Sequence, residues 1–140
     1  MKKGFTLLEV LAALAAATVL VYGASTAFLN LAPKYRLKKA AWEIQTRLNY
    51  ARYKSIFEGR PVRVRFEPTG YAVEKYDDSQ KTWQPDVRGS IEGVQIAANN
   101  SPTFHPLGTV SNLATITVSN SWGTYRITLA ISGRIRTTPL

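Results

Sequence analysis

Residues 1–11 read MKKGFTLLEVL, and they open an apolar run that continues to Ala32. Two lysines precede the run, and a single acid, Glu9, interrupts it near its start. A carboxylate within an apolar segment of membrane length costs roughly a few kcal/mol and needs a partner. No Lys, Arg or His lies between Lys3 and Lys34, so we expect the partner of Glu9 to come from outside this segment. This mismatch predicts a subunit that assembles with others.

The composition is that of a folded protein. The chain has 140 residues, of which 45% are hydrophobic and 11% aromatic, and this leaves room for one modest domain plus an appendage. The part that follows Ala32 is long enough to bury a single core of ordinary size. There is no cysteine, which excludes disulfides, thiolate chemistry and cysteine-based metal sites.

The charge balance is strongly basic. The chain carries 18 Lys and Arg against 9 Asp and Glu, a formal charge of +9, and loss of the two leading lysines would lower it to +7. Charge of this size favours polyanions or anionic surfaces as partners. A scattered positive face that only keeps the protein soluble would give the same count.

Three interpretations compete for residues 5–32. A cleaved secretory signal would have the basic start, but its apolar stretch would be shorter and would not contain Glu9. A simple transmembrane anchor fits the length, since about 20 apolar residues span the hydrocarbon, but it does not explain the acid. The third interpretation comes from a resemblance to a known class of signal.

The segment GFTLLEV at residues 4–10, with lysines before it and an Ala/Leu/Val-rich stretch after it, resembles the type III signal of type IV pilins and pseudopilins. The resemblance implies that a membrane-bound prepilin peptidase cuts after Gly4 and methylates the new N-terminus, Phe5. It also implies that Glu9 pairs with the terminal amine of a neighbouring subunit during assembly. The residue-level argument and the resemblance therefore agree on the partner of the acid.

Two features bear on how this segment behaves in a membrane. Many pilins have a proline where this chain has Thr26, and here the nearest proline is Pro33, so the usual local melting of the helix is in question.

The orientation of the segment in the membrane is a separate point. The bases that follow the apolar run outnumber those that precede it, and the positive-inside rule alone would favour a periplasmic N-terminus. The signal implies the opposite: a single pass through the bacterial inner membrane with a cytoplasmic N-terminus. The four bases Lys34, Arg36, Lys38 and Lys39 would then touch lipid headgroups or a bound polyanion.

The next segment has the pattern of an amphipathic helix. An apolar or small residue recurs with spacings of 4, 3, 4, 3 and 4 at Leu37, Ala41, Ile44, Leu48, Ala51 and Ser55. Gly59 and the following Arg-Pro pair predict the end of the helix. If Pro33 only kinks it, one helix extends over residues 5–58 and is roughly 80 Å long.

Further resemblance narrows the class. The residues LNYAR at 48–52, followed by Ser55-Ile56, Gly59 and Val62, resemble the helix end and first strand of the GspH/FimT family of minor pilins and type II secretion pseudopilins. The family implies an α+β fold, a pilin-like ladle in which the long helix packs on an antiparallel β-sheet domain. The expected organisation is a leader at 1–4, a hydrophobic helix at 5–32, an amphipathic half at 33–59 and a globular β-sheet domain at 60–140.

Alternating residues predict the strands of that domain. Residues 62–66 and 71–76 form a first hairpin, and residues 77–85 read as a polar loop. The pair Asp77-Asp78 falls far short of a calcium cage, so we expect no metal and no cofactor. A short strand follows at 94–97.

The rest of the chain contains a second hairpin and a second segment typical of the family. Residues 104–108, FHPLG, resemble an F-x-P-x-G segment of the family, and the lone His105 has no catalytic partner by motif, so a structural role is expected. The second hairpin comprises residues 114–119 and 124–132, with Tyr125, Ile127, Leu129 and Ile131 on one face and Arg126, Thr128 and Ala130 on the other.

The chain closes with GRIRT at 133–137, which resembles the G-R-x-R ending of the GspH/FimT domain. In the members concerned with natural transformation, this ending is associated with DNA binding. Period two places Arg134 and Arg136 on one face, about 7 Å apart, where each could contact a phosphate, with Arg126 as a further base. The alternative is that these arginines are solvated guards of a sheet edge.

The sequence thus favours a non-enzymatic subunit. It has one histidine, no cysteine and no glycine-rich phosphate loop. The first hypothesis is a minor pilin of a type IV filament that also binds DNA during DNA uptake. The second is an H-type minor pseudopilin of a type II secretion system without a DNA role. In both cases the expected partners are other pilin or pseudopilin subunits, the prepilin peptidase and the inner membrane.

Overall fold

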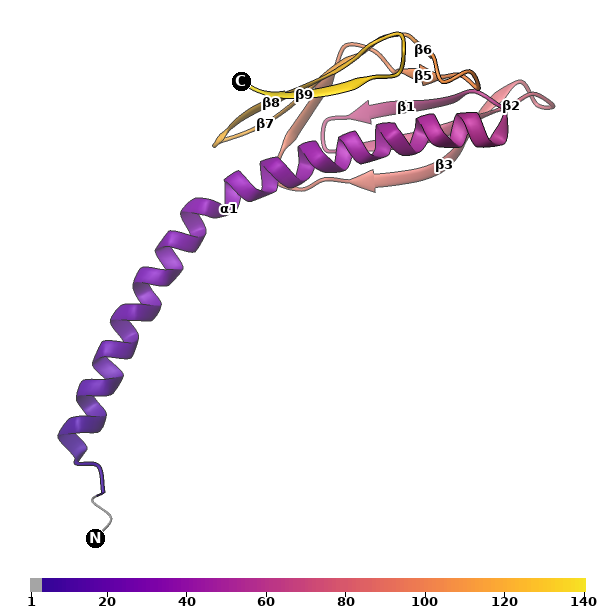
Figure 1. The fold of residues 1–140 in the computed structure, drawn as a ribbon. Coiled ribbons are helices and arrows are strands. Elements are labelled where there is room, and N and C mark those ends of the chain that lie inside the picture. Colours follow the sequence, from indigo (N-terminus) through magenta and orange to yellow (C-terminus); the bar gives the residue numbers. More distant parts are fainter. Residues whose placement is uncertain (1–3) are drawn as a thin grey trace. The chain divides into compact units, whose positions relative to one another are not determined.

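The computed structural model describes residues 4–140, except for the side chains of residues 26, 27 and 30. Most of the predicted leader, residues 1–3, and the side chain of Thr26 therefore lie outside the described residues. The chain forms two compact units, one ending at Ala32 and the other comprising Pro33–Leu140. The helix α1 (Leu7–Glu58) contributes to both, and Pro33 lies inside it (Figure 1).

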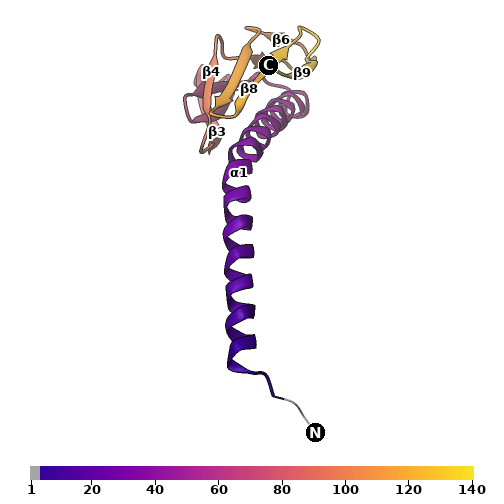
Figure 2. The ribbon, with the colours of Figure 1, turned by 90° about the vertical axis from the view of Figure 1, so that its left-hand side faces the viewer.

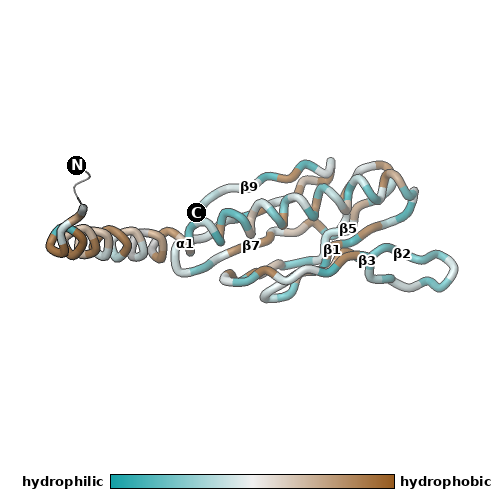
Figure 3. The backbone as a smooth tube through the Cα atoms, turned by 90° about the horizontal axis from the view of Figure 1, so that it is seen from below, coloured by the Kyte–Doolittle hydropathy of each residue, from teal (hydrophilic) through white to brown (hydrophobic). Residues whose placement is uncertain are grey.

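The first unit is an exposed apolar helix. Figure 3 shows it mostly in brown, with white segments between and a little teal near its first turn. Leu7–Ser25 is long and apolar enough to cross a membrane, and none of it is buried within the protein. The helix begins at Leu7 rather than at the predicted Phe5 because Thr6 caps it: the Thr6 hydroxyl lies 3.3 Å from the amide nitrogen of Glu9.

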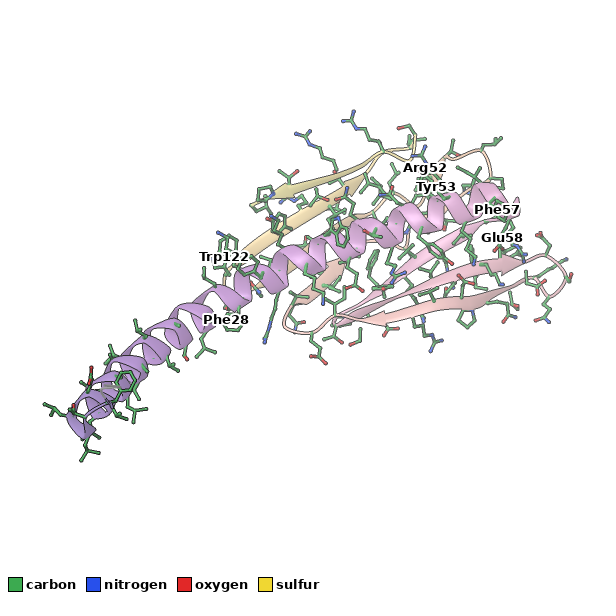
Figure 4. All side chains as sticks on the ribbon, turned by 60° about the horizontal axis from the view of Figure 1, so that its bottom comes forward. Phe28, Arg52, Tyr53, Phe57, Glu58 and Trp122 are labelled. Carbon is green, nitrogen blue, oxygen red and sulfur yellow. The ribbon has the colours of Figure 1, made fainter. Side chains whose placement is uncertain are left out.

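In the second unit, α1 has a buried face and an exposed face. The six predicted core positions, from Leu37 to Ser55, are all buried, so the predicted stripe is confirmed. The opposite face exposes large aromatic side chains, among them Tyr53 and Phe57 in Figure 4. The helix ends as predicted, with Gly59 in the left-handed conformation at φ 65° that favours glycine. The exposed aromatic stripe comprises Tyr35, Trp42, Tyr53 and Phe57.

In the described residues 4–140, nine strands form two antiparallel sheets on one side of this part of α1 (Figure 2). The first sheet has the order β3-β2-β1-β5-β6. Its strands are β1 (Val62–Glu67), β2 (Gly70–Asp77), β3 (Thr82–Ser90), β5 (Thr103–Phe104) and β6 (Val110–Ser111). The second sheet has the order β4-β7-β8-β9. Its strands are β4 (Gln95–Ala98), β7 (Thr115–Asn120), β8 (Gly123–Leu129) and β9 (Ile135–Pro139). The predicted fold class, a helix packed on antiparallel β-structure, is confirmed, although the expected single sheet is divided into two.

One predicted loop is wrong. Residues 77–85 were expected to be a polar loop, but β3 begins at Thr82 and pairs with β2 along most of its length. Tyr76 faces Trp83 across the pair, with ring centroids 5.2 Å apart. The register shifts between Val73, which pairs with Val87, and Glu74, which pairs with Pro85. β3 is also an edge strand, where proline is tolerated. Pairing with β2 therefore outweighs the polar composition of the segment.

A single core lies between α1 and the two sheets. Its largest fully buried side chains include Phe104 from β5, Leu37 and Ile44 from the helix, and Ile116 and Ile127 from the second sheet. Every member of the core falls between Leu37 and Leu129. A fragment of residues 33–140 therefore keeps all the apolar contacts that stabilise the domain.

A charged cluster attaches α1 to the edge strand β3. Lys54 Nζ donates to Asp86 Oδ2 at 2.7 Å and to the Tyr50 hydroxyl at 3.1 Å, and it lies 3.3 Å from Glu58 Oε1. Burial alone would lower the pKa of Lys54, but these hydrogen bonds raise it well above its usual range. Burial alone would also raise the pKa of Asp86, but the hydrogen bonds from Lys54 and Tyr50 hold it below its ordinary value of 3.8.

The shifted pKa of Asp86 leads to a pH prediction. A carboxyl whose folded pKa is depressed contributes stability above its unfolded pKa and loses it as the pH falls through the folded value. Asp86→Asn should therefore lower the free energy of unfolding at pH 7 by about 2 kcal/mol. It should also reduce the loss of stability below about pH 4. Urea unfolding from pH 3 to pH 7 measures both, with Asp78→Asn at an exposed position as the control. A pH dependence equal to that of the unsubstituted protein would contradict the assignment.

Candidate functional site

Three sequence segments that resemble the family meet at Arg52, in the last part of α1 (Figure 4). Its Nη2 donates to the carbonyl oxygen of Ser132 at 3.2 Å. A β-carbon at Gly108 would lie 3.7 Å from the same Nη2, and one at Gly133 would lie 2.7 Å from Nε. Arg52 thus connects the helix, the turn after β5 and the turn before β9. We call this contact the Arg52 junction.

The backbone conformation of the Arg52 junction, and at one position the lack of space, favour glycine at its two turns. Both Gly108 and Gly133 have φ 78°, a conformation that other residues rarely adopt. At Gly133 space is also short, because a β-carbon would lie 2.6 Å from the carbonyl oxygen of Gly108. The glycines of the F-x-P-x-G and G-R-x-R segments therefore allow these two turns to approach each other.

Backbone hydrogen bonds fix the turn that carries Arg134. The amide of Gly133 donates to Ala130 O at 2.9 Å, and the amide of Ala130 donates to Arg134 O at 2.9 Å. The amide of Val110 donates to Ile131 O, also at 2.9 Å, and this bond attaches the turn to β6. Ile131, expected in the second hairpin on one face with Ile127 and Leu129, lies in this turn and is 66% exposed. Arg134 precedes the first residue of β9 and belongs to the turn rather than to the strand.

Ser55 and His105 have structural contacts in the same region. The buried Ser55 hydroxyl lies 2.9 Å from Arg60 O and 3.0 Å from Phe104 O, so it links the helix end to β5. From the sequence, Ser55 is expected only as a small residue of the buried stripe, and its two hydrogen bonds are not. His105 Nε2 lies 2.8 Å from Ser111 Oγ, across the β5–β6 turn.

Arginines gather on the outer face of the second sheet. Arg126 of β8 lies opposite Thr138 of β9, and Arg136 of β9 lies opposite Thr128 of β8. Opposite residues of an antiparallel pair share a face, and so do residues two apart in one strand. Arg126 and Arg136 therefore lie on the same face, which is the face away from the buried Ile127 and Leu129. We call Arg126, Arg134 and Arg136 the arginine face.

These three arginines are exposed, and their positive charges have no acidic partner among the described residues. Among the described residues, none of them forms an ion pair with an acid, whereas Arg63, Arg65 and Arg60 all lie beside glutamates. The surrounding positions on this face are threonines, such as Thr117 opposite Arg126. The arginine face is thus a hydroxyl-rich surface with three free positive charges. It can bind an anion that is extended enough to touch several guanidinium groups.

The predicted processing and assembly residues lie at the start of the first unit. Gly4 and Phe5 precede α1 and are exposed, and no atom lies near a β-carbon placed on Gly4. Glu9 Oε2 lies 3.5 Å from the amide nitrogen of Thr6, which completes a reciprocal capping box with the Thr6 hydroxyl. Sequence reasoning missed this role, although the spacing Thr-x-x-Glu is its signature.

The described residues contain no group of three or more His, Cys, Asp or Glu side chains placed to hold a metal ion.

A helix with an exposed apolar first part and an amphipathic second part packed on antiparallel strands defines a pilin-like protein. The sequence places it further: residues 40–133 match the model of the type II transport protein GspH family, and the chain belongs to that family. None of the curated protein sequences compared with this chain is significantly similar to it.

Solved structures share the fold at low sequence identity. The minor pseudopilin EpsH of the type 2 secretion system of Vibrio cholerae is 17% identical, with a TM-score of 0.64 over 74% of this chain and 97% of that chain. The type IV minor pilin FimU of Pseudomonas aeruginosa is 18% identical, with a TM-score of 0.63 over 76% of this chain and 90% of that chain. The same fold therefore occurs in a secretion pseudopilin and in a pilus subunit.

Proposed function

We propose that this chain is a non-enzymatic minor subunit of a type IV filament that contacts DNA through its arginine face. Membership of the GspH family and the shared fold support the role of a pilin or pseudopilin subunit. The three exposed, unpaired arginines of the arginine face are the observation that carries the DNA part.

The N-terminal segment supplies the assembly part of this proposal. Cleavage after Gly4 by the prepilin peptidase leaves Phe5 as the mature, methylated N-terminus. Leu7–Ser25 anchors the subunit in the inner membrane, with the second unit in the periplasm, until the subunit enters the filament. Glu9 then pairs with the amine of a neighbouring subunit. The exposed aromatic stripe of α1 supports contact with further subunits, because large exposed apolar surfaces mark interaction sites.

The DNA contact is a phosphate contact without sequence preference. Guanidinium groups bind phosphate oxygens through charge-assisted hydrogen bonds, and the nearby threonine hydroxyls can add neutral ones. Each phosphate that is neutralised releases counterions, so affinity falls with salt, with a slope of roughly −0.9 per contact on logarithmic axes. Arg126 and Arg136 lie on adjacent strands, which gives the arginine face the width to follow a backbone over more than one phosphate.

Replacing all three arginines by glutamine should weaken DNA binding at least tenfold. It should also reduce the salt slope by about 2 to 3, because three phosphate contacts are lost. Titration of fragment 33–140 with labelled duplex DNA at several salt concentrations measures both quantities. The matched control removes the same charge from exposed positions elsewhere, as Lys39→Gln, Lys81→Gln and Arg88→Gln. An equal loss in the control, or an unchanged affinity in the arginine-face variant, would overturn the DNA proposal.

The second candidate is an H-type minor pseudopilin of a type II secretion system. The matching family is described as a type II transport protein, and the fold is shared with EpsH. In that case the positive face has no DNA role, and the second unit contacts other pseudopilins or cargo. Neighbouring genes distinguish the two: a secretion ATPase and secretin with other pseudopilins favour secretion, whereas pilus or competence genes favour the filament.

A further inference from the structure

The turn between β7 and β8 is fastened to the first residues of the second unit. Asn120 Nδ2 donates to the carbonyl oxygen of Pro33 at 2.8 Å, and the amide of Trp122 donates to Asn120 Oδ1 at 2.9 Å. Lys34 Nζ lies 5.1 Å from the centroid of the Trp122 ring, within the range of a cation–π contact. The position of Trp122 is therefore tied to that of Pro33 and Lys34, although 87 residues separate Asn120 from Pro33.

The surface around this turn is basic and aromatic. Two large aromatic side chains lie in solvent here: Trp122 is 50% exposed and Tyr35 is 65% exposed. Four exposed bases lie on this part of the helix, and two acids, Glu43 and Glu92, line one hollow with Arg36 and Lys39. In the part of the chain that the structure describes, none of the four bases forms an ion pair. We call this surface the base cluster; it comprises Lys34, Tyr35, Arg36, Lys38, Lys39 and Trp122.

Chain connectivity places the base cluster close to a membrane surface. The candidate span ends at Ser25, and the apolar run continues to Ala32, two residues before Lys34. At about 1.5 Å per helical residue, Lys34 lies roughly 3 Å along the helix beyond Ala32, where the apolar run ends. The headgroup layer adds about 5 to 8 Å beyond the hydrocarbon on each side. Lys34 thus follows directly on the apolar segment that enters the bilayer. The turn that carries Trp122 lies beside Lys34 because it is hydrogen-bonded to Pro33.

We propose that the base cluster binds the headgroups of anionic phospholipids and holds the second unit against the membrane before assembly. Trp and Tyr are enriched at membrane interfaces, where one side of the ring is apolar and the other polar. Lys and Arg close to an anionic surface add attraction. Four bases against the two nearby acids, Glu43 and Glu92, leave an excess of positive charge, which favours an anionic surface over a zwitterionic one. The inference rests on the membrane anchoring in the proposed function, and it is independent of DNA binding.

The depth of Trp122 tests this proposal. The full chain with Trp42→Phe and Trp83→Phe retains Trp122 alone, and it is reconstituted into vesicles that contain brominated lipid. With phosphatidylglycerol present, bromine should quench Trp122 at least twofold more than in pure phosphatidylcholine vesicles. A matched chain with Trp83→Phe and Trp122→Phe retains only Trp42, eight residues beyond Lys34 on the same helix, and it should show no such difference.

Charge variants identify the groups responsible. Neutralising Lys34, Arg36, Lys38 and Lys39 with glutamine should abolish the additional quenching, since each base near the surface contributes about fivefold to partitioning. The arginine-face variant should retain it. Millimolar inorganic phosphate should not reproduce the effect in phosphatidylcholine vesicles, because the proposed partner is a lipid surface.

Each remaining outcome counts against one specific statement. Equal quenching of Trp122 in both lipids, or equal quenching of Trp122 and Trp42, overturns lipid binding by the base cluster. An effect that free phosphate reproduces assigns the bases to a soluble anion and also overturns it. A chain that does not float with either kind of vesicle overturns the membrane anchoring in the proposed function itself, and the inference with it.

Discussion

Replacing Gly133 by alanine is expected to lower the free energy of unfolding by about 3 kcal/mol. Two costs add. The residue has φ 78°, and a side chain in the left-handed region costs roughly 1 to 2 kcal/mol. The new methyl group would also lie 2.6 Å from the backbone oxygen of Gly108 and 2.7 Å from Arg52 Nε, and forced overpacking costs about 1 to 3 kcal/mol. Urea unfolding of fragment 33–140 measures the loss.

Gly59 supplies the matched control for Gly133. It has a similar φ of 65°, but no atom lies within 4 Å of a β-carbon placed on it. Gly59→Ala should therefore show the backbone cost alone, about 1 kcal/mol. If the two alanine variants lose the same stability, the close approach of the two turns at the Arg52 junction contributes nothing and our explanation of the glycines is wrong.

The Arg52 junction also determines where the arginine face ends. Arg134 follows Gly133 directly, and its carbonyl accepts the hydrogen bond that closes the turn. A turn displaced by a methyl group at Gly133 would therefore move Arg134 relative to Arg126 and Arg136. The glycine of the G-R-x-R segment thus has a structural role, and it can be separated experimentally from the electrostatic role that we propose for the arginines.

Local patterns predicted the helix well because its burial is periodic. The predicted stripe from Leu37 to Ser55 is buried throughout, and the end at Gly59 follows from a left-handed backbone that glycine favours. The first hairpin was predicted correctly for a similar reason, since Val62 and Val64 alternate with Arg63 and Arg65 in burial. In each case residues close in sequence decide the structure.

The features that sequence reasoning missed depend on distant partners. β3 has no alternation of its own, and only its pairing with β2 makes it a strand. The Arg52 junction joins residues 80 positions apart, from Arg52 to Ser132. The Trp122 turn likewise depends on Pro33, from the other end of the second unit. A single sequence gives each of these segments separately, and only the fold shows which of them meet.

Replacing Glu9 by glutamine distinguishes its two roles. In the chain itself, Glu9 completes a capping box with Thr6, and glutamine can take its place there because it also accepts a hydrogen bond from a backbone amide. Glutamine cannot form an ion pair with the amine of a neighbouring subunit. Removal of one partner from a desolvated ion pair costs about 3 to 5 kcal/mol. If Glu9 acts in assembly, the variant should be incorporated at least tenfold less than the unsubstituted subunit when both are expressed together.

Sheared filaments analysed by quantitative mass spectrometry give the incorporation ratio. Glu9→Ala should fall to the same level as Glu9→Gln, since both lose the charge, and both should still be processed to a mature chain that begins at Phe5. Thr6→Ala is the control for the cap: it removes the hydroxyl bonded to the Glu9 amide, keeps the charge, and should be incorporated normally. If Glu9→Gln enters filaments as well as the unsubstituted subunit while Glu9→Ala does not, the carboxylate serves only to cap the helix. In that case the amine of another subunit is not its partner.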